Sequence, residues 1–165
     1  MGSEITAATI SNNIGQVRRD PFAMLPFTGY HQGDYLNHWL KIGAATQSEN
    51  LPKLYYVNWF RKNNEGKFLW PGYGENSRVL KWIFERTEHT ANALKTAIGW
   101  IPSENDLDLN GLNLKPESIQ ALLHVDKAEW LRECDSIDSY YQSFGDRLPK
   151  AIARELAELK VRLRE

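Results

Sequence analysis

The sequence predicts an α+β fold in which a small mixed sheet is followed by a helical second half. Two observations predict it. Before residue 80, short stretches rich in aromatic and β-branched residues alternate with clusters of Asn, Gly and Pro, which is typical of strands and turns. After residue 116, apolar residues recur at steps of three and four, which is typical of amphipathic helices. We therefore expect a helical tail, 116–165, on a small sheet, and we expect some strands of that sheet to come from the rest of a larger domain.

Composition narrows the class of protein. The 165 residues are 42% hydrophobic and 25% charged, as in an ordinary soluble domain. A net charge of -1 argues against partners such as nucleic acid or an anionic membrane. Cys134 is the single cysteine, so no intrachain disulfide can form and a reducing compartment, the cytoplasm, is expected. No run is apolar enough to predict a membrane helix or a secretory signal.

The first half of the chain predicts a loop, a helix and a hairpin. Gly2–Gly15 is small and polar, which predicts a mobile loop. Asp34–Ile42 predicts a helix with one apolar stripe. Leu54–Arg61 and Lys67–Trp70 predict paired strands, because Asn63-Asn64-Glu65-Gly66 supplies turn residues between them. The stripe of the helix consists of Tyr35, Leu36, Trp39 and Leu40.

The next helix is predicted over Arg78–Glu88, and either Asn76 or Ser77 can cap it. Gly99–Leu112 contains Pro102 and Gly111 and predicts an irregular connector. The residues expected to face inward on this helix are Val79, Leu80, Ile83 and Phe84.

Three further helices are predicted in the tail. Pro116 begins the first, Asp126 with Glu129 forms a capping box for the second, and Pro149 opens the third. Gly145 can end the second helix. Their expected apolar seams are Ile119, Leu122 and Leu123, then Trp130, Cys134, Ile137, Tyr141 and Phe144, then Ile152, Leu156, Leu159 and Leu163.

The segment Val57–Arg78 holds more large rings than one strand face can use. A break at Pro71-Gly72-Tyr73-Gly74 lets the backbone approach another group closely. Rings that converge on such a break beside an amide side chain offer a planar base two faces to stack on and an edge partner. The rings and the amide are Trp59, Phe60, Phe68, Trp70, Tyr73 and Asn76.

Three longer sequence segments resemble those of a known protein family. NWFRKNNEGKFLWPGYGENSRVLKW resembles the guanine-binding segment of GTP-dependent phosphoenolpyruvate carboxykinase, RRDPFAMLPFTGYHQGDYLNHWLKIG resembles the block before it, and MGSEITAA resembles the start of the mobile active-site lid. The resemblance runs from Met1 to near the C-terminus and is weaker after Thr87. It implies a lid loop at 1–17, followed at 18–165 by the C-terminal part of a nucleotide-binding domain with its guanine pocket at 57–78. The chain would then correspond to roughly the last quarter of such an enzyme, the usual scale of one domain.

The resemblance implies that Phe68 and Tyr73 form the two faces of a base sandwich, with Tyr73 where the family usually has phenylalanine. Trp59 and Phe60 would close the pocket, and strand alternation allows only one of them to touch the base. From the residues alone, a core position is the more usual role for such rings. Asn76 can read the guanine edge or cap a helix, and the two roles can coexist; the GENSR word favours base reading.

Five residues match the start of the lid, although Met-Gly-Ser alone is more typical of a cloning remnant. In the family this loop shields an enolate from water, so that the enolate is phosphorylated rather than protonated to pyruvate. Thr9–Ile14 departs from members that carry charged residues there. The matching residues are Ser3, Glu4, Thr6, Ala7 and Ala8.

The implied activity is that of a lyase that converts oxaloacetate and GTP to phosphoenolpyruvate, GDP and carbon dioxide, in gluconeogenesis or anaplerosis, with manganese and magnesium. No GxxxxGK[ST] phosphate loop is present, and the four histidines lack acidic or cysteine partners at ligand spacing. We therefore expect no catalytic residue and no metal site in this segment, and an inactive isolated chain. Surface solvation is expected for Arg18, Arg19, Arg61 and Lys67.

A second hypothesis belongs to another class: a stand-alone module that binds a nucleotide or a Pro-rich peptide without catalysis. Binding to single-stranded RNA is disfavoured by the near-neutral charge. A chain that lacks its upstream partner should expose apolar surface, so self-association is expected.

Overall fold

The computed structural model describes residues 19, 24 and 27–165, and the backbone alone of 3–4 and 17–18. The chain divides into two units. The first combines Met1–Leu51 with Leu131–Lys160, and the second combines Pro52–Trp130 with Val161–Glu165.

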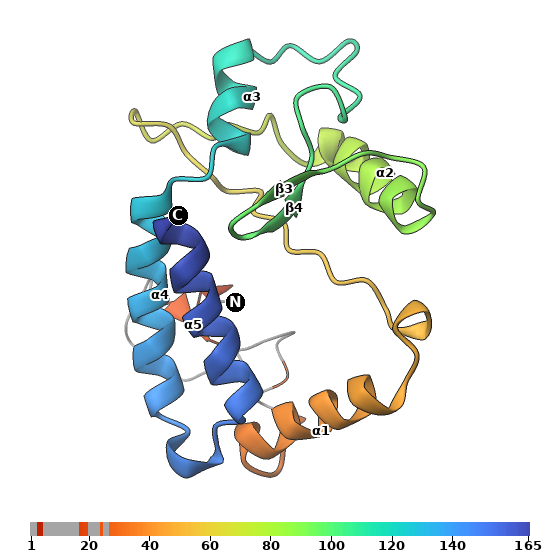
Figure 1. Cartoon of the computed structure of the whole chain (residues 1–165). Coiled ribbons are helices and arrows are strands. Elements are labelled where there is room, and N and C mark those ends of the chain that lie inside the picture. Colours follow the sequence, from red (N-terminus) through yellow and green to blue (C-terminus); the bar gives the residue numbers. More distant parts are fainter. Residues whose placement is uncertain (1–2, 5–16, 20–23, 25–26) are drawn as a thin grey trace. The chain divides into compact units, whose positions relative to one another are not determined.

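The first unit is mainly helical. It contains α1 (Gln32–Ala45), a 3-10 turn at Ser48–Asn50, most of α4 (Lys127–Gln142), a 3-10 turn at Gly145–Arg147 and most of α5 (Lys150–Arg164). Helices α4 and α5 run side by side (Figure 1), and Lys160 joins them through ion pairs to Asp135 and Asp138. The two-residue strands β1 (Ser3–Glu4) and β2 (Val17–Arg18) pair antiparallel, which brings the two ends of the segment between them together.

The core of the first unit forms along the predicted seams of α4 and α5. Cys134, Phe144 and Leu156 are buried, as the helical periodicity predicts. The start of α1 packs closely against the turn that follows α4. The approach is so close that a Cβ on Gly33 would collide with the Arg147 carbonyl. Gln32 is also buried there, and neither its side-chain nitrogen nor its oxygen has a hydrogen-bond partner among the described residues.

The second unit contains two short helices and a hairpin. Its elements are a 3-10 turn at Tyr73–Glu75, α2 (Asn76–Thr87), β3 (Leu94–Thr96), β4 (Gly99–Ile101) and α3 (Pro116–Leu123). β3 and β4 pair antiparallel with Leu94 opposite Ile101 and Thr96 opposite Gly99. The buried apolar residues of this unit are Leu69, Trp70, Trp82, Leu107, Ile119 and Leu163.

The α+β class is confirmed, and so are the helices predicted from Pro116 and Pro149 onward. The predicted capping box is confirmed on one side, since the Glu129 N–H donates to Asp126 Oδ1 at 2.9 Å. The predicted hairpin over Leu54–Arg61 and Lys67–Trp70 was wrong in extent: one antiparallel bridge, between Lys62 and Phe68, replaces it. The strands in the described residues lie instead in the two short antiparallel pairs, and β4 occupies the start of the predicted connector.

The predicted inward face of α2 was wrong for two of its four residues, since Val79 and Ile83 are half-buried but Leu80 and Phe84 are exposed. Leu80 is 56% exposed and Phe84 is 66% exposed, whereas Trp82 is the buried residue of this helix. The Trp82 indole N–H donates to the Asn92 carbonyl at 3.1 Å, and its ring meets Tyr55 edge-on. The largest ring, with a hydrogen bond available, therefore takes the inward side.

No helix among the described residues has the length and apolarity needed to cross a bilayer.

Candidate functional site: an aromatic surface before helix α2

A tight turn sets the geometry of the aromatic segment. The Asn63 side-chain oxygen accepts from the backbone N–H groups of Glu65 and Lys67, at 3.0 and 2.9 Å. Gly66 completes the turn with φ 76, a left-handed conformation that glycine adopts without steric cost. Because the chain reverses here, the Leu69 N–H reaches the Arg61 carbonyl at 2.9 Å, and the residues before and after the turn face one another.

The outer side of this reversal carries two exposed rings. Phe60 is 72% exposed and Phe68 is 58% exposed, and their rings meet edge-to-face with centroids 6.1 Å apart. The Lys62 ammonium lies over the Phe68 ring, 4.9 Å from its centroid. Phe68 therefore has a cation over its ring and a second ring beside it, and still remains more than half exposed.

The inner side carries two tryptophans. Trp70 is 5% exposed, and the half-buried Trp59 lies against it at a tilted angle with centroids 6.4 Å apart. Trp59 thus contacts the buried Trp70, whereas Phe60 contacts the exposed Phe68. Residues 59 and 60 form a turn, so the strand alternation expected for them does not apply. None of Phe60, Phe68 and Tyr73 occupies a core position.

A glycine bend connects this segment to α2. Gly72 has φ 124 and ψ -171, a conformation essentially restricted to glycine. The bend leads into the 3-10 turn at Tyr73–Glu75, where the Tyr73 side chain is 92% exposed. A tyrosine ring held in water at a helix start is available for stacking, and its hydroxyl can be hydrated.

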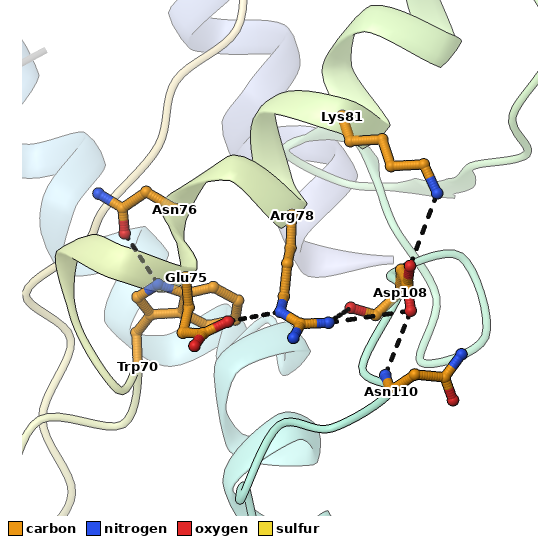
Figure 2. A network of polar contacts seen from close by, with 7 residues as sticks. All are labelled: Trp70, Glu75, Asn76, Arg78, Lys81, Asp108 and Asn110. Atoms are coloured by element: carbon orange, nitrogen blue, oxygen red, sulfur yellow. Dashed lines mark hydrogen bonds and ion pairs between the residues drawn. The ribbon is translucent and has the colours of Figure 1, made fainter.

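Asn76 stands at the first position of α2, and the helix N-cap is Glu75, without a side-chain capping bond. The Asn76 carboxamide does not cap the helix. It accepts a hydrogen bond from the Trp70 indole, with Nε1 2.9 Å from Oδ1. Figure 2 shows the amide oxygen turned toward the indole and the amide nitrogen turned away from it.

An ionic network holds the start of α2 in place (Figure 2). Arg78 donates from Nε to Glu75 Oε2 and from Nη1 to the Asp108 carbonyl, both at 2.6 Å. Lys81 lies 3.7 Å from the Asp108 carboxylate. The Asn110 backbone N–H donates to this carboxylate at 3.2 Å; together with the nearby charges of Lys81 and Arg78, it lowers the pKa of Asp108 below the ordinary 3.8.

A pocket of about 520 Å³ lies between α2 and the loop at 104–110. Arg78, Lys81 and Asp108 line it, and their charges are already paired with one another. Neither the exposed rings nor Asn76 line this pocket. The aromatic surface before α2 and the pocket beside α2 are therefore separate.

Two of the expected surface cations are not simply solvated. Arg61 donates to the carbonyls of Leu122 and His124 at the end of α3, at 3.0 and 3.1 Å. The largely buried Arg19 pairs with Glu133 at 2.5 Å and donates to Ser136. Both arginines are structural.

The lid residues fall at the edge of what the structure describes. Ser3 and Glu4 form the backbone of β1, while Thr6, Ala7 and Ala8 lie outside the described residues. Across the described part of the chain, no three His, Cys, Asp or Glu side chains converge to hold a metal ion.

Sequence reasoning missed the partners of Asn76. Trp70 gave no sign of a polar role, because its indole reads as one more ring in an aromatic segment. Asp108 and Arg78 are 30 positions apart, and no local pattern predicts their pairing. The spacing of Asp108 and Asn110 is typical of an Asx turn, and this signal could have been read.

Comparison with known proteins identifies the class. Residues 1–162 match the family model described as the phosphoenolpyruvate carboxykinase C-terminal P-loop domain. Phosphoenolpyruvate carboxykinase [GTP] of Treponema pallidum (strain Nichols) is 54% identical over 164 residues, which cover 99% of this chain and 26% of that protein. The proteins of the same name from Paenarthrobacter aurescens (strain TC1) and Renibacterium salmoninarum are 50% and 49% identical, and the match covers 99% of this chain and 27% of each.

The chain therefore belongs to the GTP-dependent phosphoenolpyruvate carboxykinase family, as its sequence words predict, and matches the C-terminal domain of that family. It spans about a quarter of the length of these curated relatives.

Proposed function

We propose that this chain supplies guanine binding and the active-site lid to an enzyme that converts oxaloacetate and GTP to phosphoenolpyruvate, GDP and carbon dioxide. The observation that carries the proposal is the exposure of Phe60, Phe68 and Tyr73 in the same short segment as a fixed, half-buried Asn76. Solvent-exposed rings of this size are suited to stacking rather than to core packing.

In this proposal Phe68 and Tyr73 take the two faces of the base, Phe60 its edge, and Trp59 the floor. Stacking on aromatic rings contributes about 1–3 kcal/mol per base, so the two faces supply most of the base affinity. The carbonyl at position six of guanine then accepts from Asn76. Adenine has an amine at that position and leaves the donor unpaired, which disfavours it.

The lid belongs to Ser3, Glu4, Thr6, Ala7 and Ala8. The pairing of β1 with β2 supports a loop between them, because it holds both ends of the segment 5–16 at one place. Closure of this loop would keep water from the enolate formed by decarboxylation, so that the enolate oxygen attacks the γ-phosphorus of GTP and GDP leaves.

The manganese and magnesium ligands of the full enzyme, like its phosphate loop, are expected in other segments; no three His, Cys, Asp or Glu among the described residues could hold a metal ion. For that reason we expect the isolated chain to be inactive as a decarboxylase and as a phosphoryl-transfer enzyme. Its setting is cytoplasmic gluconeogenesis or anaplerosis. Production of phosphoenolpyruvate by the purified chain from oxaloacetate and GTP would contradict the assignment of the chemistry to other segments.

The test of base binding is a nucleotide titration of the 165-residue chain, followed by NMR because a base held without a phosphate site binds weakly. GDP is expected to bind more tightly than ADP, and a Pro-rich peptide is not expected to bind. Tyr73→Ala should weaken GDP binding about tenfold through loss of one stacking face, whereas Tyr73→Phe keeps the ring and serves as the control. Asn76→Ala should remove the preference for GDP over ADP. Equal affinity of the unaltered chain for GDP and ADP would defeat the proposal.

A further inference from the structure

The orientation of the Asn76 carboxamide is set by chemistry as well as by geometry. An indole nitrogen can only donate a hydrogen bond, so the Asn76 atom 2.9 Å from Trp70 Nε1 must be the carbonyl oxygen. The opposite orientation would place the amide NH₂ against the indole N–H, donor against donor. Trp70 therefore allows one of the two orientations and opposes the other.

Both partners of this hydrogen bond are also held by other contacts. The Trp70 ring is buried and packs on Trp59, which fixes the direction of its N–H. The Asn76 backbone begins α2, where Arg78 ties Glu75 and the Asp108 carbonyl to the first turn of the helix. The buried indole and the start of α2 that carries the carboxamide are thus both held by contacts other than their own hydrogen bond.

Within the described part of the chain, the Asn76 amide nitrogen makes no hydrogen bond, and it points away from the indole (Figure 2). We propose that Trp70 is a positioning residue: its indole N–H holds the Asn76 carboxamide so that the NH₂ group faces the purine, and this donor selects a carbonyl at position six. The inference rests on the base-reading role proposed for Asn76 and adds the residue that decides what Asn76 reads.

The selected ligand class is a 6-oxopurine. Guanine and hypoxanthine both present an acceptor at position six, whereas adenine presents an amine that donates. The inosine nucleotide should therefore be accepted at this position as guanine is. The 2-amino group, which only guanine carries, has no role in this contact.

The experiment compares GDP, IDP and ADP binding to the 165-residue chain and its variants. Trp70→Phe keeps a ring in the core and removes the N–H, so the carboxamide can turn over; the preference for GDP and IDP over ADP should fall about tenfold. Trp100→Phe, an exposed ring on β4, is the matched control and should leave the preference unchanged. A purely structural role for Trp70 would instead weaken all three nucleotides alike and leave their ratio intact, and that result would overturn the inference.

A second variant does not depend on the stability of Trp70→Phe. Asn76→Asp retains an oxygen that accepts from the indole but removes both donors, so GDP and IDP binding should fall at least about tenfold relative to ADP binding. The Trp70 indole proton resonance should keep its hydrogen-bonded shift in Asn76→Asp and lose it in Asn76→Ala. Retained preference for GDP in Asn76→Asp, or an indole resonance unmoved by Asn76→Ala, would refute the positioning role.

These outcomes separate the two proposals. If the unaltered chain does not distinguish GDP from ADP, base reading by Asn76 and its positioning by Trp70 fail together. If the unaltered chain prefers GDP and Trp70→Phe prefers it equally, base reading stands and the positioning role alone falls.

Discussion

The aromatic residues of the segment 57–78 differ in burial, and the side of the chain on which each one lies determines whether it is buried or exposed. Trp70 is buried, whereas Phe60, Phe68 and Tyr73 remain in water. Full burial of a phenylalanine stabilises a fold by about 1.5–3 kcal/mol relative to exposure, so three exposed rings forgo a large contribution. One exposed ring needs no explanation, but a group of them indicates a surface that something covers.

The sequence predicted which residues matter in this segment better than it predicted their surroundings. Phe68 read equally well as a core ring, because alternation along a strand does not tell which face is buried when both faces carry rings. From the residues alone Asn76 read more readily as a helix cap, because an asparagine before a helical pattern usually is one, and only the family resemblance favoured base reading. The hydrogen bond from Trp70 decides against capping by the side chain, and that bond depends on the glycine bend at Gly72 between them.

Gln32 provides a prediction that concerns stability alone. Its carboxamide is buried in the first unit and makes no hydrogen bond to the residues that the structure describes; an unpaired buried polar group costs about 1–3 kcal/mol. Gln32→Met keeps the length of the side chain and removes both polar atoms, so it should raise the free energy of unfolding by about that amount. Urea unfolding followed by circular dichroism measures it.

The control for Gln32→Met is Gln120→Met on the exposed side of α3, which should be close to neutral. If Gln32→Met lowered the urea midpoint, the Gln32 amide would have a stabilising partner, and the account of its burial would be wrong.

At the level of secondary structure, helices were predicted well and strands poorly. Pro116 and Pro149 set helix starts through local backbone chemistry, which a sequence carries in full. β3 and β4 are three residues each, too short for an alternation pattern to stand out. The inward face of α2 was misread in part, because the apolar Leu80 and Phe84 were placed on it whereas Trp82, which donates to the Asn92 carbonyl, was not.

The anchoring of α2 to the loop at 104–110 should depend on pH. The pKa of Asp108 is lowered in the folded chain, chiefly by the Asn110 N–H and then by Lys81 and Arg78. A lowered folded pKa means that the carboxylate stabilises the fold above its unfolded value of 3.8, and that this stabilisation is lost as the pH falls below 3.8 through the folded value. Asp108→Asn, which keeps an acceptor oxygen but removes the charge, should therefore melt below the unaltered chain at about pH 7, and the gap should close in strong acid.

Thermal melts from about pH 2 to pH 7 test this. Asp146→Asn, an exposed position in the 3-10 turn Gly145–Arg147, controls for the general effect of removing one negative charge. A gap between Asp108→Asn and the unaltered chain that stayed constant down to the most acid point would show that the Asp108 charge does not stabilise the fold.

For the molecule as a whole, family membership could be predicted from the sequence, because the segments that resemble the family are long and nearly continuous from Met1 onward. The α+β class followed from the same reading. The way in which each unit closes on itself was not readable, because it depends on pairs such as Arg19 with Glu133 and Arg61 with the end of α3, which are 114 and 61–63 positions apart. Such contacts join residues that are far apart in the sequence, so no local sequence pattern predicts them.

The apolar face of α2 leads to the last prediction, which is that the chain associates with itself. Leu80 and Phe84 are one turn apart on the same stripe and both are mostly exposed. Two large apolar side chains in one patch are unfavourable in water and favour burial against another copy. Replacing both, Leu80→Glu with Phe84→Gln, should weaken association at least about tenfold, since each buried leucine or phenylalanine contributes about 1.5–3 kcal/mol.

Sedimentation velocity over a range of chain concentrations measures this association. Ser77→Glu adds the same charge to an exposed position of α2 without removing apolar surface, and it should associate almost as the unaltered chain does. An unaltered chain that stayed monomeric at all concentrations would count against the prediction, and so would a double variant that associated as strongly as Ser77→Glu. In the expected case, the same stripe that begins with Asn76 at the proposed base site continues through Leu80 and Phe84 as an apolar contact surface, so one helix serves the nucleotide with its first turn and a protein surface with the next two.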